Sequence, residues 1–137
     1  MKTAGYSSTP LARKLGIKHG NTLRLIGVPA HYFDLFADFP EGTSRPDSGP
    51  VDFIHFFTDR AAELEQLLPE LKAQIHPNGM IWVSWPKKAS GVLTDISENL
   101  IRDTALAIGL VDVKVCAVDD TWSGLKLVIP VSLRPRT

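Results

Sequence analysis

The chain has 137 residues, with 15 basic and 15 acidic side chains and no net charge at pH 7. This length suits one domain with its own core, so we expect residues 1–137 to form a single α/β domain. The neutral balance argues against a general attraction to nucleic acid or membranes, and any charged site must be local. The single cysteine, Cys116, excludes an intrachain disulfide and lies in an apolar run typical of a buried thiol.

The first half of the chain alternates helical and strand-like segments. A short helix is expected at residues 10–15, ending at Gly16, followed by a strand at about 22–28. Residues 30–39 are rich in aromatic side chains with helical spacing. Residues 40–50 hold three prolines and two glycines, which predicts a mobile loop inside the domain. Residues 51–57 are apolar on both faces and predict a buried parallel strand.

The second half continues this alternation with two longer helices. Leucines from Leu64 onward predict a helix that runs to Ile75, kinked or broken near Leu68 by Pro69. Residues 80–85 form the next expected strand. Asp95 and Glu98 have the spacing of a capping box, which predicts a helix up to about Ile108.

Two strands are expected to close the chain, at 111–118 and 125–131. The stretch "D-D-T-W-S-G" between them predicts a hairpin, which makes the last strand antiparallel. In the first of these strands, Asp112 and Lys114 should face outward. The residues expected to face inward are Val111, Val113, Val115 and Ala117. We expect residues 133–137 to be a frayed tail.

This order of elements predicts a Rossmann-like α/β fold with a mostly parallel sheet of five strands. The expected strand order is first, second, third, fifth, fourth. Right-handed crossovers that step in one direction place their helices on one face of the sheet. The other face keeps only the N-terminal helix, so we predict that either a partner subunit in a homodimer or the N-terminal segment covers it.

Several stretches carry a resemblance to known families. The segment "L-L-P-E-L-K-A-Q-I-H-P-N-G-M-I-W-V-S-W", with the helix and hairpin after it, resembles the C-terminal half of class I methyltransferase folds. Three further motifs are similar to the bacterial domain-of-unknown-function family 3052: "A-G-Y-S-S-T-P-L-A-R-K-L-G-I", "V-S-W-P-K-K-A-S-G-V" and "D-V-K-V-C-A-V-D-D-T-W-S-G-L-K-L-V". That family implies no established activity.

The sequence departs from a methyltransferase in its first half. A glycine-rich turn should follow the first strand, but "L-I-G-V-P-A" has only Gly27, with Pro29 close behind. Two strands of the methyltransferase fold also have no counterpart in this sequence. One of them ends in the acidic residue that would hold the ribose hydroxyls of the cofactor. We therefore expect a truncated fold that has lost its methyl-donor site and uses no cofactor.

Ligands of open α/β sheets bind at the carboxyl ends of the strands, where residues 27–29, 58–60, 85–91 and 119–124 should gather. Lysines there can bind phosphate or carboxylate as point charges, and the backbone of residues 89–91 can add N–H donors. The alternative is a loop whose lysines are simply solvated. The candidate ligand-binding residues are Trp85, Lys87, Lys88, Ser90, Gly91, Asp119, Asp120, Trp122 and Ser123.

Each of these candidates also has a purely structural interpretation. The two tryptophans either stack on a ligand ring or pack at the rim of the sheet. The two aspartates either act as acid–base groups or form the turn. The histidines lack metal-ligand spacing, so no metal site is expected, and His55 reads as a hydrogen-bonded core imidazole. Residues 3–8 could cover the same edge, reach a partner or remain flexible.

Three functions follow from these features. The first is a cytoplasmic, non-catalytic binding or regulatory module that takes a small anionic molecule or a protein partner. The alternative is an enzyme acting on an anionic small molecule, in which Lys87 or Lys88 binds the anion and Asp119 or Asp120 moves a proton. The third, binding of single-stranded nucleic acid by the Trp/Lys loop, is disfavoured by the zero net charge.

Overall fold

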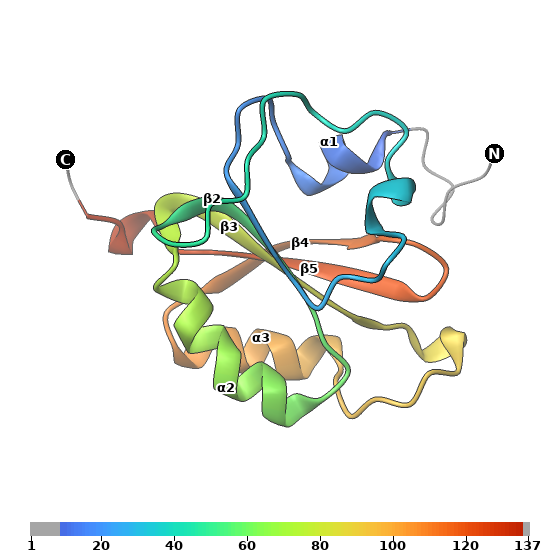
Figure 1. The fold of residues 1–137 in the computed structure, drawn as a ribbon. Coiled ribbons are helices and arrows are strands. Elements are labelled where there is room, and N and C mark those ends of the chain that lie inside the picture. Colours follow the sequence, from blue (N-terminus) through green and yellow to red (C-terminus); the bar gives the residue numbers. More distant parts are fainter. Residues whose placement is uncertain (1–8, 136–137) are drawn as a thin grey trace.

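A computed structural model describes residues 9–135, which build a five-stranded sheet in the order β1-β2-β3-β5-β4 (Figure 1). The first three strands are parallel, and β5 runs antiparallel to both its neighbours, β3 and β4. The strands are β1 (Leu23–Ile26), β2 (Val51–Phe57), β3 (Ile75–Pro86), β4 (Val111–Ala117) and β5 (Trp122–Val128). The predicted α/β class, strand order and antiparallel last strand are confirmed.

Helices α2 (Ala61–Lys72) and α3 (Glu98–Ala107) lie together on one face of this sheet (Figure 1). Their apolar stripes bury Leu64, Leu68 and Ile101 against the strands, and none of these three side chains is exposed. The strands contribute mainly β-branched and aromatic side chains to the same cluster: Val51, Ile54, Phe56, Ile81, Val83 and Trp85. Both helices lie on one face, as the right-handed crossovers predict.

The opposite face is covered by the N-terminal part of the chain, through α1 (Leu11–Leu15) and the 3-10 helix η2 (Tyr32–Leu35) (Figure 1). The indole N–H of Trp82 donates to the carbonyl of Leu15 at 2.7 Å and ties α1 to the sheet. Among the described residues, α1 and the aromatic segment around η2 therefore pack on this face. A homodimer remains a prediction, and residues 3–8 lie outside the described part of the chain.

The aromatic segment and helix α2 differ from expectation. The helical spacing of residues 30–39 yields only the single turn η2. Helix α2 runs unbroken through Pro69, which lies on its exposed side, so the predicted break is wrong. The helix ends at Lys72, and Ile75 already belongs to β3.

Strand β3 contains an irregularity just before the expected strand at residues 80–85. Val51 pairs with Ile75 and Phe53 with Met80, so the residues between form a bulge within β3. A Cβ atom on Gly79 would lie 2.9 Å from the carbonyl oxygen of Asp52. The glycine is therefore needed for this close approach of two backbones.

The predicted capping box of α3 is also wrong. Ser97 is the N-cap, and its hydroxyl accepts a hydrogen bond from the Leu100 N–H at 3.1 Å. The Asp95 carboxylate instead accepts from the Ala61 N–H at 2.7 Å, at the start of α2. Asp95 thus caps a helix distant in sequence, and local spacing does not reveal such a partner.

The expected alternation along β4 is broken by a second bulge, between Asp112 and Lys114. Asp112 pairs with Leu127 and faces α3, where its carboxylate accepts from Arg102 Nε at 3.0 Å. Val113 is 56% exposed instead of facing the core. A bulge on this outer strand also makes the sheet edge a poor template for pairing with another chain.

The loop and the tail are held by specific contacts. Within residues 40–50, Ser44 forms a bridge to Thr22, and its carbonyl accepts from the Leu23 N–H at 2.8 Å. After β5 the described chain forms the 3-10 helix η4 (Val131–Leu133), and Arg134 Nε donates to the Ile129 carbonyl at 2.9 Å. The last two residues of the expected tail lie outside the described residues. No helix in residues 9–135 is long and apolar enough to cross a membrane.

Candidate functional site

The two predicted stretches lie side by side at the carboxyl ends of the parallel strands. Pro86 at the end of β3 pairs with Trp122 at the start of β5. One residue later, the Lys87 N–H donates to the Thr121 carbonyl at 2.7 Å. The antiparallel pairing of β3 and β5 therefore brings residues 85–91 next to residues 119–124, as the predicted topology required.

The two tryptophans do not share a crevice. Trp85 is only 8% exposed and packs in the cluster beneath α2 and α3. Trp122 belongs to the cluster on the opposite face, where its ring meets the ring of Phe57 edge-on at 5.0 Å. Trp122 pairs with Pro86, one position beyond Trp85, and successive positions in a strand point to opposite faces. The structure thus places both rings in or against the core.

The loop after β3 is built by its own small residues. It contains the 3-10 helix η3 (Lys88–Ser90), whose C-cap Gly91 has φ +78°. The Ser90 hydroxyl donates to the Lys87 carbonyl at 2.6 Å and accepts from the Val92 N–H at 3.1 Å. Ser90 and Gly91 therefore shape the loop.

The other side chains of this loop are exposed or half-buried. Lys88 is exposed, Lys87 is half-buried, and Leu93 is 91% exposed. Within residues 9–135 neither lysine forms an ion pair. Two cations and a fully exposed leucine thus occur within seven residues.

Asp119 forms the turn between β4 and β5. Its Oδ1 atom accepts from the N–H groups of Thr121 and Trp122, both at 2.8 Å. Its Oδ2 atom lies 3.5 Å from Nε2 of His31, a residue that the sequence analysis did not select. The position of His31, shortly after the first strand, is the signal that could have placed it at this edge. Asp120 is exposed, and Ser123 pairs with Trp85.

A chain of buried polar groups lies under this edge. The Tyr32 hydroxyl is 2.9 Å from Nδ1 of His55, and Nε2 of His55 is 2.8 Å from the Ser84 hydroxyl. Burial lowers the pKa of His55 to about 3 and raises the pKa of Tyr32, so both are neutral near pH 7. His55 and Ser84 have the spacing of a base and a nucleophile, but both side chains are fully buried. His55 is the core imidazole that the sequence predicted.

The turn after β1 lies close to the end of the neighbouring strand β2. Gly27 has φ +68°, and a Cβ atom there would lie 2.6 Å from the carbonyl oxygen of Phe57 at the end of β2. In dinucleotide-binding turns, glycines let the backbone approach a ligand. Here the missing side chain lets the end of β1 pack against the end of β2.

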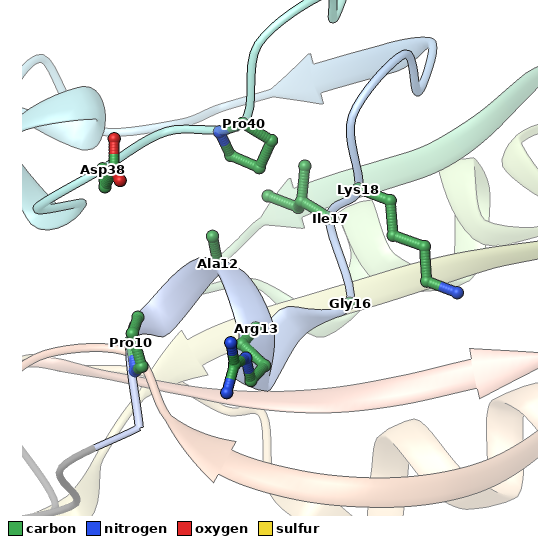
Figure 2. A pocket seen from close by; sticks show the side chains of 8 residues that line it. All are labelled: Pro10, Ala12, Arg13, Gly16, Ile17, Lys18, Asp38 and Pro40. Atoms are coloured by element: carbon green, nitrogen blue, oxygen red, sulfur yellow. The ribbon is translucent and has the colours of Figure 1, made fainter.

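Three surface cavities are found elsewhere in residues 9–135. One of about 400 Å³ lies between α1 and residues 38–40. In Figure 2, Ala12 and Ile17 point towards Pro40 while Lys18 extends away. Two more, of about 450 and 350 Å³, lie beside β1. None of the three is lined by residues 85–91 or 119–124.

The described residues favour neither a metal site nor a reactive thiol. In residues 9–135, no group of three or more histidine, cysteine, aspartate or glutamate side chains could hold a metal ion. Cys116 is half-buried, and burial raises the pKa of its thiol, although Lys14 and Lys114 act in the opposite direction. A raised pKa disfavours the reactive thiolate.

Residues 48–131 match the family described as "Protein of unknown function (DUF3052)", and the chain belongs to this family. The match covers β2 to β5, including both loops of the candidate site. No curated protein matches the sequence.

Solved methyltransferases share the fold at low sequence identity. A SAM-dependent methyltransferase from Aquifex aeolicus has a TM-score of 0.61 and 14% identity, with 88% of each chain covered. A ribosomal protein L11 methylase from Lactobacillus delbrueckii subsp. bulgaricus has a TM-score of 0.57 and 13% identity, covering 87% of this chain and 74% of that one. The N-methyltransferase NodS from Bradyrhizobium japonicum WM9 gives 0.57 and 12%, covering 88% and 92%. The fold is therefore methyltransferase-like.

Proposed function

We propose that this protein is a non-catalytic binding module on a methyltransferase-like fold whose methyl-donor site is closed. The observation that carries this proposal is the contact between Gly27 and Phe57. In the turn after β1, where a donor would approach the backbone, a Cβ atom added at Gly27 would lie only 2.6 Å from the Phe57 carbonyl oxygen. Tyr32 comes shortly after this turn in the sequence. Its side chain is buried against the ring of Phe57, with ring centroids 5.8 Å apart.

The polar groups of the candidate site serve the fold, which supports a role without catalysis. The Asp119 carboxylate accepts from two backbone N–H groups, and the Ser90 hydroxyl bonds its own loop. The Ser84–His55 pair lies beneath the surface, where no substrate can reach it. The hydrogen bonds of Asp119 and Ser90 are thus accounted for by the turn and the loop that they hold.

The binding surface in this proposal is the loop Lys87–Leu93. A leucine that is 91% exposed, close in sequence to two lysines that form no ion pair within the described residues, fits a partner that offers an apolar pocket and acidic side chains. The zero net charge of the chain makes a protein a better match than nucleic acid. We therefore assign the surface to a protein partner.

A photo-crosslinking experiment tests this surface. A photoreactive residue replaces Leu93 in one variant and Val131, which is also exposed, in a matched control. Crosslinking in cells of the source organism should give one discrete protein adduct from position 93 that is lost in the Lys87→Ala/Lys88→Ala background. Equal adducts from both positions, or none from position 93, would contradict the proposal.

The pair formed by His31 and Asp119 favours a second candidate function. An exposed imidazole whose Nε2 lies 3.5 Å from a carboxylate could move a proton beside the two lysines, as an enzyme acting on an anionic substrate requires. Titration with inorganic phosphate would then shift the amide NMR signals of residues 87–91 to saturation. Absence of such shifts would remove this candidate.

A further inference from the structure

Three charged side chains line one cavity at the β1 edge of the sheet, away from the loop Lys87–Leu93. This cavity has a volume of about 450 Å³, and its charged lining residues are Arg24, Arg45 and Asp47. An adjoining cavity of about 350 Å³ shares Arg24 and Asp47. The charge pattern of this edge has no part in the function proposed above.

Arg24 is held in place by neutral acceptors. Its Nη1 atom donates to the side-chain oxygen of Gln74 at 3.1 Å, and its Nη2 atom donates to the Pro46 carbonyl at 2.9 Å. These bonds fix the guanidinium between β1, the turn after α2 and the loop without cancelling its charge. A guanidinium has five N–H donors, so donors remain for a ligand.

The other two charges are not neutralised either. The guanidinium carbon of Arg45 lies 5.3 Å from the centroid of the Phe33 ring, a cation–π contact that restrains the side chain. Within residues 9–135, neither arginine forms an ion pair with Asp47 or with any other carboxylate. Two cations and one anion thus line the cavity without a direct ion pair between them.

The backbone of β1 adds a further donor. The Leu23 N–H points to the outer edge, where it reaches the Ser44 carbonyl at 2.8 Å. Successive residues of a strand alternate, so the N–H of Leu25 points to the same side. Leu25 also lines the cavity, just past the point where the loop is bonded to β1.

We propose that this cavity binds a small zwitterion with net negative charge, of the acidic amino acid class. Its carboxylates lie against Arg24 and Arg45, and its ammonium group lies against Asp47. The guanidinium fork matches the two oxygens of a carboxylate. Two positive charges against one negative charge favour a ligand with two carboxylates and one ammonium.

The test compares two probes that differ in one group, L-glutamate and glutarate. Both are titrated at constant ionic strength while amide NMR signals are followed. L-Glutamate should give saturable shifts centred on residues 23–25 and 45–49 and should bind more tightly than glutarate. Asp47→Asn should remove this preference, and Arg45→Ala should weaken L-glutamate binding about tenfold, as expected for loss of one charged hydrogen bond.

Arg13→Ala is the matched control, because Arg13 lines the separate cavity beside α1. It should leave L-glutamate binding unchanged. Arg24→Lys keeps the charge next to Pro46 and Gln74 and should weaken binding in a protein that still folds, as its amide spectrum would show. Glutarate binding as tightly as L-glutamate, equal losses in Arg13→Ala and Arg45→Ala, or no saturable shift would each overturn the proposal.

Discussion

The hydroxyl of Tyr32 lies 2.9 Å from Nδ1 of His55 and joins the aromatic turn η2 to the centre of β2. On its other side, His55 meets the Ser84 hydroxyl on β3. A neutral imidazole donates from one nitrogen and accepts at the other, so both partners are needed to satisfy it. This buried chain connects the segment that follows β1 to two central strands.

Removing the Tyr32 hydroxyl should therefore destabilise the fold. Tyr32→Phe leaves a buried imidazole nitrogen without a partner, which costs about 1–3 kcal/mol of unfolding free energy. Urea denaturation followed by circular dichroism measures this loss. Phe33→Leu, at a neighbouring side chain that is 44% exposed, should cost less. Equal stability of Tyr32→Phe and the natural protein would show that the hydrogen bond contributes nothing.

Stability should fall as the solution becomes more acidic, through His55. Its pKa is about 3 in the folded state, below the ordinary value of 6.5, so the unfolded state binds the proton first. The contribution of His55 is complete above pH 6.5 and is lost as the pH falls towards 3, by up to about 1.4 kcal/mol per pH unit. Between pH 6.5 and 5, His55→Gln should show a flatter dependence than the natural protein. His19→Gln serves as the exposed control, and equal slopes for all three proteins would refute this role of His55.

A side chain at Gly27 should disrupt the packed turn after β1. Gly27 and Gly49 both have positive φ, but only Gly27 would press a Cβ atom against a carbonyl oxygen, since Gly49 has open space around it. Both alanine variants share the conformational cost of about 1–2 kcal/mol. Gly27→Ala should cost about 1–3 kcal/mol more than Gly49→Ala, because of the close contact. Similar thermal unfolding of the two variants would mean that the turn is not packed as described.

Substitutions in the loop Lys87–Leu93 should leave the fold intact. Lys88 and Leu93 are exposed, so Lys88→Ala and Leu93→Ser should change the unfolding free energy by no more than about 0.5 kcal/mol. Ser90→Ala should cost more, because the Ser90 hydroxyl bonds the loop on both sides. Denaturant titration of the three variants checks this order, and a large loss in Leu93→Ser would mean that this side chain serves the fold.

The sequence predicted the architecture because its strongest patterns are local. The apolar run 51–57 forms β2 with the expected bounds, and alternating helices and strands determine the strand order. Bulges were missed, because they depend on pairing between strands. Asp112 faces α3 only because Val113 bulges out of register with β5. Asp95 caps α2 for a similar reason, through a contact with a residue far away in the chain.

The candidate site was predicted in its location and less well in its details. Pairing of β3 with β5 brings Lys87 to Thr121, as strand order alone requires. The sequence could not show that Trp85 and Trp122 point to opposite faces, because this depends on which residue of one strand faces which of the other. His31 was not predicted as a site residue, because its contact Asp119 lies far away in the sequence.

The most direct test of the closed methyl-donor site is a calorimetric titration of the protein with S-adenosylmethionine. The SAM-dependent methyltransferase from Aquifex aeolicus, which shares the fold, serves as the positive control under the same conditions. With the turn at Gly27 packed against Phe57, the protein should give no saturable heat while the control binds. Saturable binding of S-adenosylmethionine with micromolar affinity would contradict the account.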